Sequence, residues 1–397
     1  MIEIKEISSI SEAKKELKKL EVYKEGIGIM APKFLFKVFK LKNLDIRAAL
    51  ILKQEMLSIG GEAAIPRGAI DLSLKVGNVL LAGTVKQYKA LIKKLKRQPF
   101  GLKEVSAELE KLIGSTAFRP EPIKCGEYEL NFDRPLIMGV LNVTPDSFSD
   151  GGDFVETDTA LDHAVKMAED GADIIDVGGE STRPGSDPVP LEDELRRVEP
   201  VVRGIVENCD LPVSVDTAKP AVAERCINLG ASMLNDVTGL RNSEMIRVAA
   251  EYEVPVVIMH MKGKPKTMQK EIVYGDVVSD IKDFFMERIE EARSKGVKDI
   301  IIDPGIGFGK TTEHNLTIIK RLEEFRTLQC PVLIGTSRKS FIGNTLGIED
   351  SKERLYGTIA SNIAAAENGA DIIRVHDVEE HKEALDLYYA IKKVEKC

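Results

Sequence analysis

The chain has 397 residues, enough for two domains and a large hydrophobic core. No apolar run approaches the roughly 20 residues needed to cross a bilayer, and the start MIEIKEISSI lacks the pattern of a signal peptide, so neither a membrane protein nor a secreted protein is expected. The five cysteines are scattered without a CxxC pair, which argues against a disulfide framework or a zinc site and favours the cytoplasm.

Charge divides the chain into two parts. Residues 1–122 hold 23 Lys and Arg against 14 Asp and Glu, a net charge of +9. The whole chain has a net charge of −8, so residues 123–397 have a net charge of −17. Two prolines interrupt the segment TAFRPEPIKCG (116–126), where we place the domain boundary. The positive charge of residues 1–122 could belong to a solvated Lys-rich face, to an anion-binding site or to a contact with the acidic domain. No nucleic-acid-binding motif is present in the sequence.

The N-terminal domain, residues 1–122, is expected to be a small α/β module of unknown function. Its predicted helices cover residues 11–20, 44–59, 84–95 and 104–113, and its predicted strands cover 63–65 and 79–81.

From residue 136 onward, eight short apolar runs alternate with segments of helical period. The first run, 136–143, is followed by a polar loop in which Pro145 and Gly151-Gly152 prevent the strand from continuing. The other runs also end in polar or glycine-rich segments, at Gly179, Asp216, Asn235, His260, Asp303, Ser337 and Arg374. Eight strand–helix units predict a (β/α)8 TIM barrel over residues 123–397, near the usual size of about 250 residues. An open doubly wound sheet is the alternative, less favoured because polar residues follow all eight strands and not one switch point.

Six of these segments carry a resemblance to a known family. They are NVTPDSFSDGG (142–152), IIDVGGESTRPG (174–185), SVDT (214–217), IDPGIGFGK (302–310), GTSRKSFIG (335–343) and RVHD (374–377). In order, spacing and length they resemble dihydropteroate synthase, a transferase of folate biosynthesis. The resemblance implies an enzyme that condenses 6-hydroxymethyl-7,8-dihydropterin pyrophosphate with an arylamine and releases pyrophosphate. It also implies a pterin slot, a pyrophosphate clamp and an arylamine pocket.

Four strand-end residues suit the pterin slot: Asp216, Asn235, Asp303 and Lys339. Carboxylates can accept hydrogen bonds from the amino group and ring N–H of a pterin, while Asn and Lys can donate to its other atoms. We expect the catalytic residues to be Asp216, Lys339 and Arg374, with an anionic Asp216 stabilising the cation that forms as pyrophosphate leaves. Alternatively, Asp216 could be a helix N-cap.

The pyrophosphate clamp is expected to contain Asn142, Arg374 and His376, with Thr182 beside them. Mg²⁺ prefers oxygen ligands, so Asn142 and phosphate oxygens are a plausible magnesium site. Arg374 could bind phosphate in a bidentate manner or stack on the pterin face. His376, like His260, could also be a packed, hydrogen-bonded histidine.

The arylamine pocket is expected to include Phe308, Lys339 and Ser340, because Ser340 opens a predicted helix whose first N–H groups could receive a carboxylate. Two loops would close over the substrates. They contribute Asp146, Phe148, Asp150, Arg183 and Pro184.

Two other functions share part of this pattern. A methyltransferase-type pterin barrel would need Asp216, Asn235 and Asp303 but not the pyrophosphate residues. A non-catalytic pterin-binding protein would tolerate substitutions at the site, yet every expected position is filled. The arylamine could be 4-aminobenzoate or a ribosylated aminobenzene phosphate of methanopterin synthesis, which a basic N-terminal domain would suit. A homodimer paired through the outer helices is expected.

Overall fold

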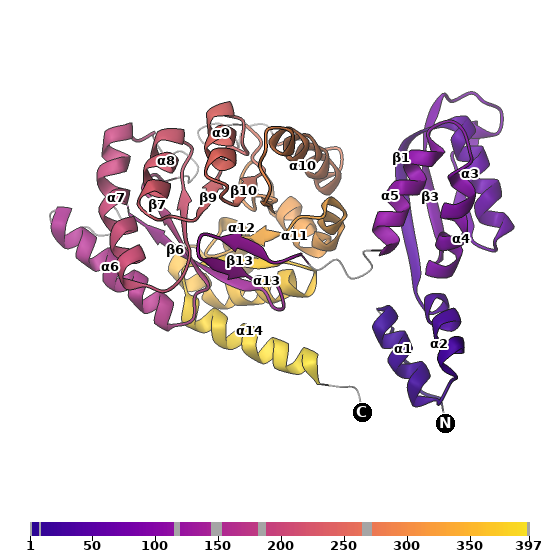
Figure 1. Ribbon diagram of the computed structural model, residues 1–397, viewed down its shortest axis with the longest axis horizontal. Helices are drawn as coiled ribbons and strands as arrows, with labels where there is room; N and C mark the ends of the chain where they lie inside the picture. Colours follow the sequence, from indigo (N-terminus) through magenta and orange to yellow (C-terminus); the bar gives the residue numbers. More distant parts are fainter. Residues whose placement is uncertain are drawn as a thin grey trace. The chain divides into compact units, whose positions relative to one another are not determined.

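The chain divides into two units, Met1–Phe118 and Arg119–Cys397, each with its own hydrophobic core (Figure 1). The computed structural model describes residues 2–7, 9–114, 120–143, 153–181, 188–263 and 272–394.

The N-terminal unit is an antiparallel sheet of order β1-β3-β2 with helices packed against it. Its strands are β1 (Phe36–Asp45), β2 (Glu62–Ala64) and β3 (Val76–Thr84), and its helices are α1 (Ile10–Lys19), α2 (Lys24–Met30), α3 (Ile46–Ser58), α4 (Val85–Leu95) and α5 (Leu102–Gly114). All four predicted helices and both predicted strands are present, whereas β1 and α2 were not predicted. Helix α3 begins at Ile46 because Asp45 caps it, its side chain accepting from the Arg47 N–H at 2.8 Å.

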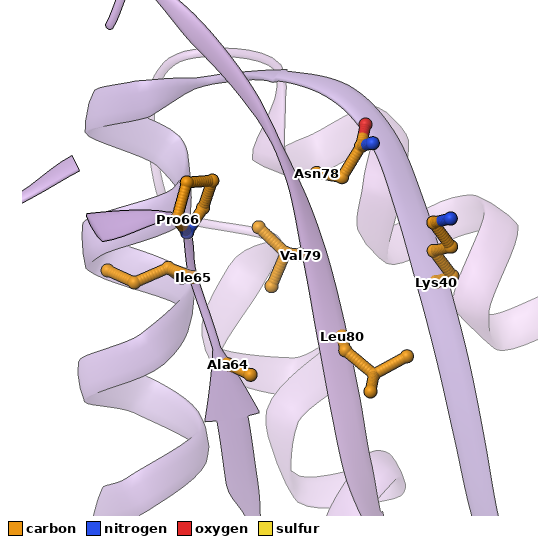
Figure 2. Close-up of a pocket in the computed structure, with 7 residues that line it drawn as sticks. All are labelled: Lys40, Ala64, Ile65, Pro66, Asn78, Val79 and Leu80. Atoms are coloured by element: carbon orange, nitrogen blue, oxygen red, sulfur yellow. The ribbon is translucent and has the colours of Figure 1, made fainter. Parts of the chain in front are cut away.

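The sheet of the N-terminal unit leaves one face partly uncovered. Phe36 is 62% exposed and Val38 is 53% exposed. A pocket of about 370 Å³ in the same unit is lined by residues of β1, of β3 and of β2 with the two positions that follow it. Figure 2 shows its mostly apolar lining, to which Lys40 and Asn78 add the polar side chains. None of the residues predicted for catalysis lines this pocket, so the predicted chemistry belongs to the second unit.

The second unit is the predicted (β/α)8 barrel. Its parallel strands are β6 (Leu136–Asn142), β7 (Ile174–Gly178), β8 (Val213–Asp216), β9 (Met233–Asp236), β10 (Val256–Met259), β11 (Ile300–Asp303), β12 (Leu333–Ile334) and β13 (Ile372–Val375). Neighbouring strands pair in the order β11-β10-β9-β8-β7-β6-β13-β12, and a parallel bridge between Ile302 and Val332 joins the two ends. The eight predicted strands are therefore confirmed, and the alternative prediction of an open doubly wound sheet is wrong.

Helices surround this barrel (Figure 1). They are α6 (Asp153–Glu169), α7 (Leu191–Asn208), α8 (Pro220–Asn228), α9 (Ser243–Glu251), α10 (Val277–Ser294), α11 (Thr312–Lys320), α12 (Ser340–Leu346), α13 (Leu355–Glu367) and α14 (Val378–Lys393). Short 3-10 helices lie at Leu322–Leu328 and Ser351–Arg354. Within the described ranges, no helix is long and apolar enough to cross a membrane.

The interior of the barrel changes from apolar to polar along its axis. The inward side chains near the strand starts form one apolar cluster, which includes Met138, Ile174 and Met233. A hairpin that was not predicted, β4 (Ile123–Cys125) and β5 (Tyr128–Leu130), adds its buried side chains to that cluster. Side chains alternate along a strand, so residues two positions further on point into the same interior. These residues include Asp176, Asn235, Asp303 and Arg374, and they place a polar site at the carboxyl ends of the strands.

Candidate active site

The guanidinium of Arg374 lies at the polar end of the barrel. Arg374 on β13 donates from Nε to Asp176 Oδ2 at 2.7 Å and from Nη2 to Asp216 Oδ2 at 2.9 Å. Asp176 is fully buried and Asp216 is 7% exposed. Three strands that are far apart in sequence are thus joined by one buried ion-pair network. Helix α8 begins at Pro220 with Lys219 as its N-cap, so Asp216 is not a helix cap.

Asp176 is a site residue that the sequence analysis missed. Besides Arg374, its Oδ2 accepts from Asn235 Nδ2 at 2.9 Å. Its other oxygen, and Oδ1 of Asp216, are buried without a hydrogen-bond partner in the structure as described. The signal was present in the sequence: Asp176 interrupts the apolar run I-I-D-V-G at an inward position, where an unpaired carboxylate would be costly.

Asp303 and Lys339 lie close enough to this network for their charges to interact with Arg374. Asp303 ends β11, and its Oδ1 accepts from the Gly305 N–H at 2.7 Å. Lys339 Nζ donates to the carbonyl oxygen of Ile306 and lies 4.6 Å from the centre of the Phe308 ring. The predicted pterin residue Lys339 and the predicted arylamine residue Phe308 are therefore neighbours.

The loop after β11 is held against β10. Gly305 has φ of 68°, and a Cβ there would lie 2.0 Å from the carbonyl oxygen of His260, so only glycine fits. Lys310 was not predicted. Its buried Nζ lies 3.0 Å from His260 Nδ1 and donates to the carbonyl oxygens of His260 at 3.2 Å and Phe308 at 3.0 Å. His260 is accordingly a buried, hydrogen-bonded residue.

The predicted clamp residues lie at neighbouring strand ends. Asn142 ends β6, and a Cβ on the facing Gly178 would lie 3.9 Å from Asn142 Oδ1 and 3.5 Å from Asp216 Cβ. His376 follows β13, and its Nδ1 lies 2.9 Å from Ser337 Oγ. Ser340 is exposed at the first position of α12, where helix formation was predicted. The positions Asp146, Phe148, Asp150, Thr182, Arg183 and Pro184 lie outside the described residues.

Burial and neighbouring charges shift the pKa values of this cluster. Burial raises the pKa of Asp216 to about 7, against the opposing effect of Arg374. Burial also raises the pKa of Asp303, which Lys339 partly offsets. For Lys339, loss of water lowers the pKa to about 8 despite the attraction of Asp303. The site thus holds groups whose protonation can change near neutral pH.

Comparisons with known proteins show which family this chain belongs to. The model of the pterin binding enzyme family matches residues 138–376. Dihydropteroate synthase of Synechocystis is 44% identical over 275 residues, which are 68% of this chain and 95% of that relative. The solved structure of Xanthomonas albilineans dihydropteroate synthase with 4-aminobenzoic acid has a TM-score of 0.67 and 43% identity, covering 70% of this chain and all of that one. The chain belongs to the dihydropteroate synthase family.

Other members of the dihydropteroate synthase family match beyond the barrel. A bifunctional dihydropteroate synthase/dihydropteroate reductase of Helicobacter pylori is 34% identical over 385 residues, 96% of this chain and 97% of the relative. A probable bifunctional folylpolyglutamate synthase/dihydropteroate synthase of Haloferax volcanii is 40% identical over 357 residues, 87% of this chain. The present chain spans only 42% of the length of that haloarchaeal relative.

The cost of burying the Asp216 carboxylate is testable with Asp216→Asn. The pKa of this group is ~3.9 in an unfolded chain and about 7 in the folded protein, so the folded state keeps a proton that the unfolded state releases. Through this group, the free energy of unfolding of the wild type should fall as the pH rises from about 4 to about 7. The Asn variant has no such proton. Its stability relative to the wild type is therefore expected to rise across this window and to level off above it. Urea unfolding of the ligand-free protein at a series of pH values measures this difference, and a pH-independent difference would contradict the argument.

Proposed function

We propose that this chain is a dihydropteroate synthase that joins 6-hydroxymethyl-7,8-dihydropterin pyrophosphate to 4-aminobenzoate in folate biosynthesis. The observation that carries the proposal is the buried network of Asp176, Asp216 and Arg374, with Asp303 and Lys339 near it. The family membership supports the same activity.

The reaction is a substitution at the exocyclic methylene carbon of the pterin. The C–O bond to pyrophosphate breaks with its electron pair going to the leaving group, the amine nitrogen forms the new C–N bond, and the amine loses a proton. Because an aromatic amine is a weak nucleophile, the positive charge that develops on the methylene and the ring must be stabilised. An ionised Asp216 beside the ring would provide this stabilisation in a site shielded from water.

The pterin slot is proposed from hydrogen-bonding complementarity. Oδ1 of Asp176 and Oδ1 of Asp216 are buried acceptors with no partner among the described side chains, and a pterin edge supplies N–H donors. Asn235, Asp303 and Lys339 complete the slot. Two nitrogens of Arg374 are occupied by carboxylates, which favours stacking of its flat guanidinium on the pterin over bidentate phosphate binding.

The leaving group and its metal are proposed at Asn142 and His376, with Thr182 beside them. In the described part of the chain, no three His, Cys, Asp or Glu side chains are grouped to hold a metal ion. One amide oxygen from Asn142 together with phosphate oxygens and water fits Mg²⁺, which prefers oxygen ligands and keeps several waters. Asn142 would supply the protein oxygen, and the bound ion would neutralise charge on the pyrophosphate.

The arylamine pocket is proposed beside Phe308, with Lys339 and Ser340 receiving the carboxylate. The loop residues Asp146, Phe148, Asp150, Arg183 and Pro184 would complete it. The X. albilineans structure with 4-aminobenzoic acid supports this amine over a ribosylated one. A methyltransferase-type barrel or a non-catalytic binding protein would not need the complete set of leaving-group residues that this chain retains. A cytoplasmic homodimer is the proposed state.

Pyrophosphate release tests the proposed function. The chain is incubated with the pterin pyrophosphate and Mg²⁺ in three reactions: without arylamine, with 4-aminobenzoate, and with a ribosylated aminobenzene phosphate. We expect release that depends on 4-aminobenzoate. Release only with the phosphorylated amine would move the activity to methanopterin synthesis, and pterin binding without release would favour a binding protein.

Replacement of Asn142 tests the magnesium site. Removing one oxygen ligand in Asn142→Ala is expected to raise the Mg²⁺ concentration for half-maximal pyrophosphate release by about 10-fold or more. Titration of EDTA-treated enzyme with MgCl₂ measures this concentration. A lower kcat at an unchanged Mg²⁺ dependence would assign Asn142 to substrate binding alone.

We also propose a reductase activity, because the H. pylori reductase relative matches the N-terminal unit as well as the barrel. A hydride from a reduced nicotinamide would pass to C6 of dihydropteroate while N5 gains a proton, giving the tetrahydro product and the oxidised nicotinamide. We expect dihydropteroate-dependent oxidation of NADPH or NADH by the full chain. A synthase-active chain that oxidises neither donor would restrict the activity to the synthase.

A further inference from the structure

Arg338 has an unusual backbone conformation between two site residues. Its φ is 58°, in the left-handed region that non-glycine residues seldom adopt. Ser337 precedes it and Lys339 follows it, so the turn at Arg338 sets the directions of both neighbours. Such a conformation persists only when the surrounding structure holds it, and it often marks a functional constraint.

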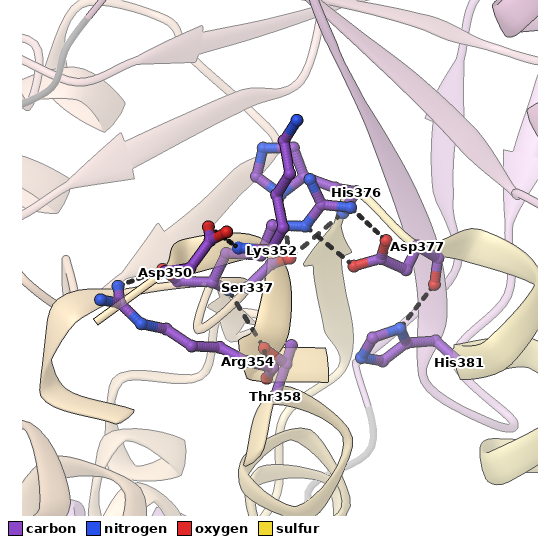
Figure 3. A network of polar contacts seen from close by, with 9 residues as sticks. Ser337, Asp350, Lys352, Arg354, Thr358, His376, Asp377 and His381 are labelled. Atoms are coloured by element: carbon purple, nitrogen blue, oxygen red, sulfur yellow. Dashed lines mark hydrogen bonds and ion pairs between the residues drawn. The ribbon is translucent and has the colours of Figure 1, made fainter. Parts of the chain in front are cut away.

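Two side chains hold the backbone of Arg338, and both of them, Arg354 and Thr358, are labelled in Figure 3. Its N–H donates to Thr358 Oγ1 at 3.1 Å, and its carbonyl oxygen accepts from Arg354 Nη1 at 3.0 Å. The N–H of Lys339 then donates to the carbonyl oxygen of Thr336 at 3.1 Å, which closes the turn.

The side chain of Arg338 is bound by the residue that follows His376. Nε of Arg338 donates to Asp377 Oδ2 at 3.2 Å, and Nη2 donates to Asp377 Oδ1. Asp377 occupies the N-cap of α14, where an aspartate normally accepts from the helix N–H groups, yet its carboxylate makes no capping bond. That carboxylate is committed to Arg338.

A second contact lies beside this ion pair. Ser337 Oγ accepts from the main-chain N–H of His376 at 3.3 Å and lies 2.9 Å from its Nδ1. With its oxygen already accepting, the Ser337 hydroxyl can donate to Nδ1, which leaves the ring proton of a neutral His376 on Nε2. Two consecutive residues, Ser337 and Arg338, therefore contact two other consecutive residues, His376 and Asp377, respectively.

We propose that the Arg338–Asp377 ion pair is a positioning device that fixes Lys339 and His376 relative to one another. Through the turn, the pair directs Lys339 towards Asp303 and Phe308. Through Asp377 and Ser337, it sets the place and the tautomer of His376. The inference rests on the proposed function, in which Lys339 binds the pterin and His376 binds the pyrophosphate. Arg338 and Asp377 would then align the C–O bond that joins the pterin methylene to the pyrophosphate.

The chain offers a matched control in another Arg–Asp pair. Arg134 donates to Asp173 at 2.7 and 2.8 Å near the starts of β6 and β7, at the opposite ends of the strands from the site. The side chains are 39% and 20% exposed, against 32% and 15% for Arg338 and Asp377. Loss of either pair should lower thermal stability, but only the Arg338–Asp377 pair should affect turnover.

The test compares Arg338→Gly, Asp377→Asn, their combination and Arg134→Ala. Glycine adopts a φ near 58° freely, so Arg338→Gly removes the guanidinium and keeps the turn accessible. We expect kcat to fall about 10- to 100-fold in each single variant of the proposed pair, because misplacement by about 1 Å can cost that much. The double variant should lose little more than the worse single variant, and Arg134→Ala should keep its kcat within about twofold.

A readout that needs no turnover separates this inference from the proposed function. The chain has five histidines, so the ring ¹⁵N resonances of His376 can be assigned by substitution. We expect Arg338→Gly and Asp377→Asn to change these resonances and Arg134→Ala to leave them in place. If the wild type is inactive but the resonances change, the proposed function fails and the positioning stands. Unchanged resonances with kcat within twofold of the wild type, or losses that multiply in the double variant, would overturn the positioning role.

Discussion

The structure depends on keeping one guanidinium and several carboxylates inside a barrel. Arg374 is enclosed by Asp176 and Asp216 from two other strands, and this arrangement is stable only because each charge has a partner. The partners come from β7 and β8 of the same closed parallel sheet, and the register of β13, β6, β7 and β8 sets their Cα positions relative to Arg374. The apolar half of the barrel and the β4–β5 hairpin provide the packed base on which this polar half is built.

The same constraint explains where glycine is needed. Gly178 and Gly335 point towards the polar interior, where a Cβ on Gly178 would contact Asp216 and a Cβ on Gly335 would lie 4.0 Å from Lys339 Nζ. Their missing side chains leave room at the mouth of the barrel. Gly305 is needed for a different reason, since a Cβ at this position would clash with the carbonyl oxygen of His260. The loop that carries Phe308 is thereby fixed against β10, and Lys310 bonds to both segments.

Sequence analysis predicted where the candidate site lies because strand ends are visible as polar residues after apolar runs. Asp216, Asn235, Asp303 and Arg374 follow that pattern, and all four lie at the same end of the barrel. Asp176 was missed because it lies within a strand, where only its inward position distinguishes it from the apolar neighbours. Lys310 was missed because a lysine in a glycine-rich loop has no periodic signal. Its burial depends on contacts with two segments, Nδ1 and the carbonyl oxygen of His260 after β10 and the carbonyl oxygen of Phe308 in the loop itself. Strand β1 (FKVFKLKNLD) carries both Lys and apolar residues on each face and remains half exposed, so it lacks the regular apolar–polar alternation that marks a strand.

The protonation of the site follows from the competition between burial and pairing. Without substrate, the interior holds the carboxylates Asp176, Asp216 and Asp303 near Arg374 and Lys339, and burial raises the pKa of Asp216 to about 7. A pterin would place N–H donors against the unpaired oxygens, and hydrogen bonds to a carboxylate favour its ionised form. Substrate binding would therefore lower the pKa of Asp216 and produce the anion beside the ring where positive charge develops. In this way the proposed substrate itself completes the electrostatics that its reaction requires.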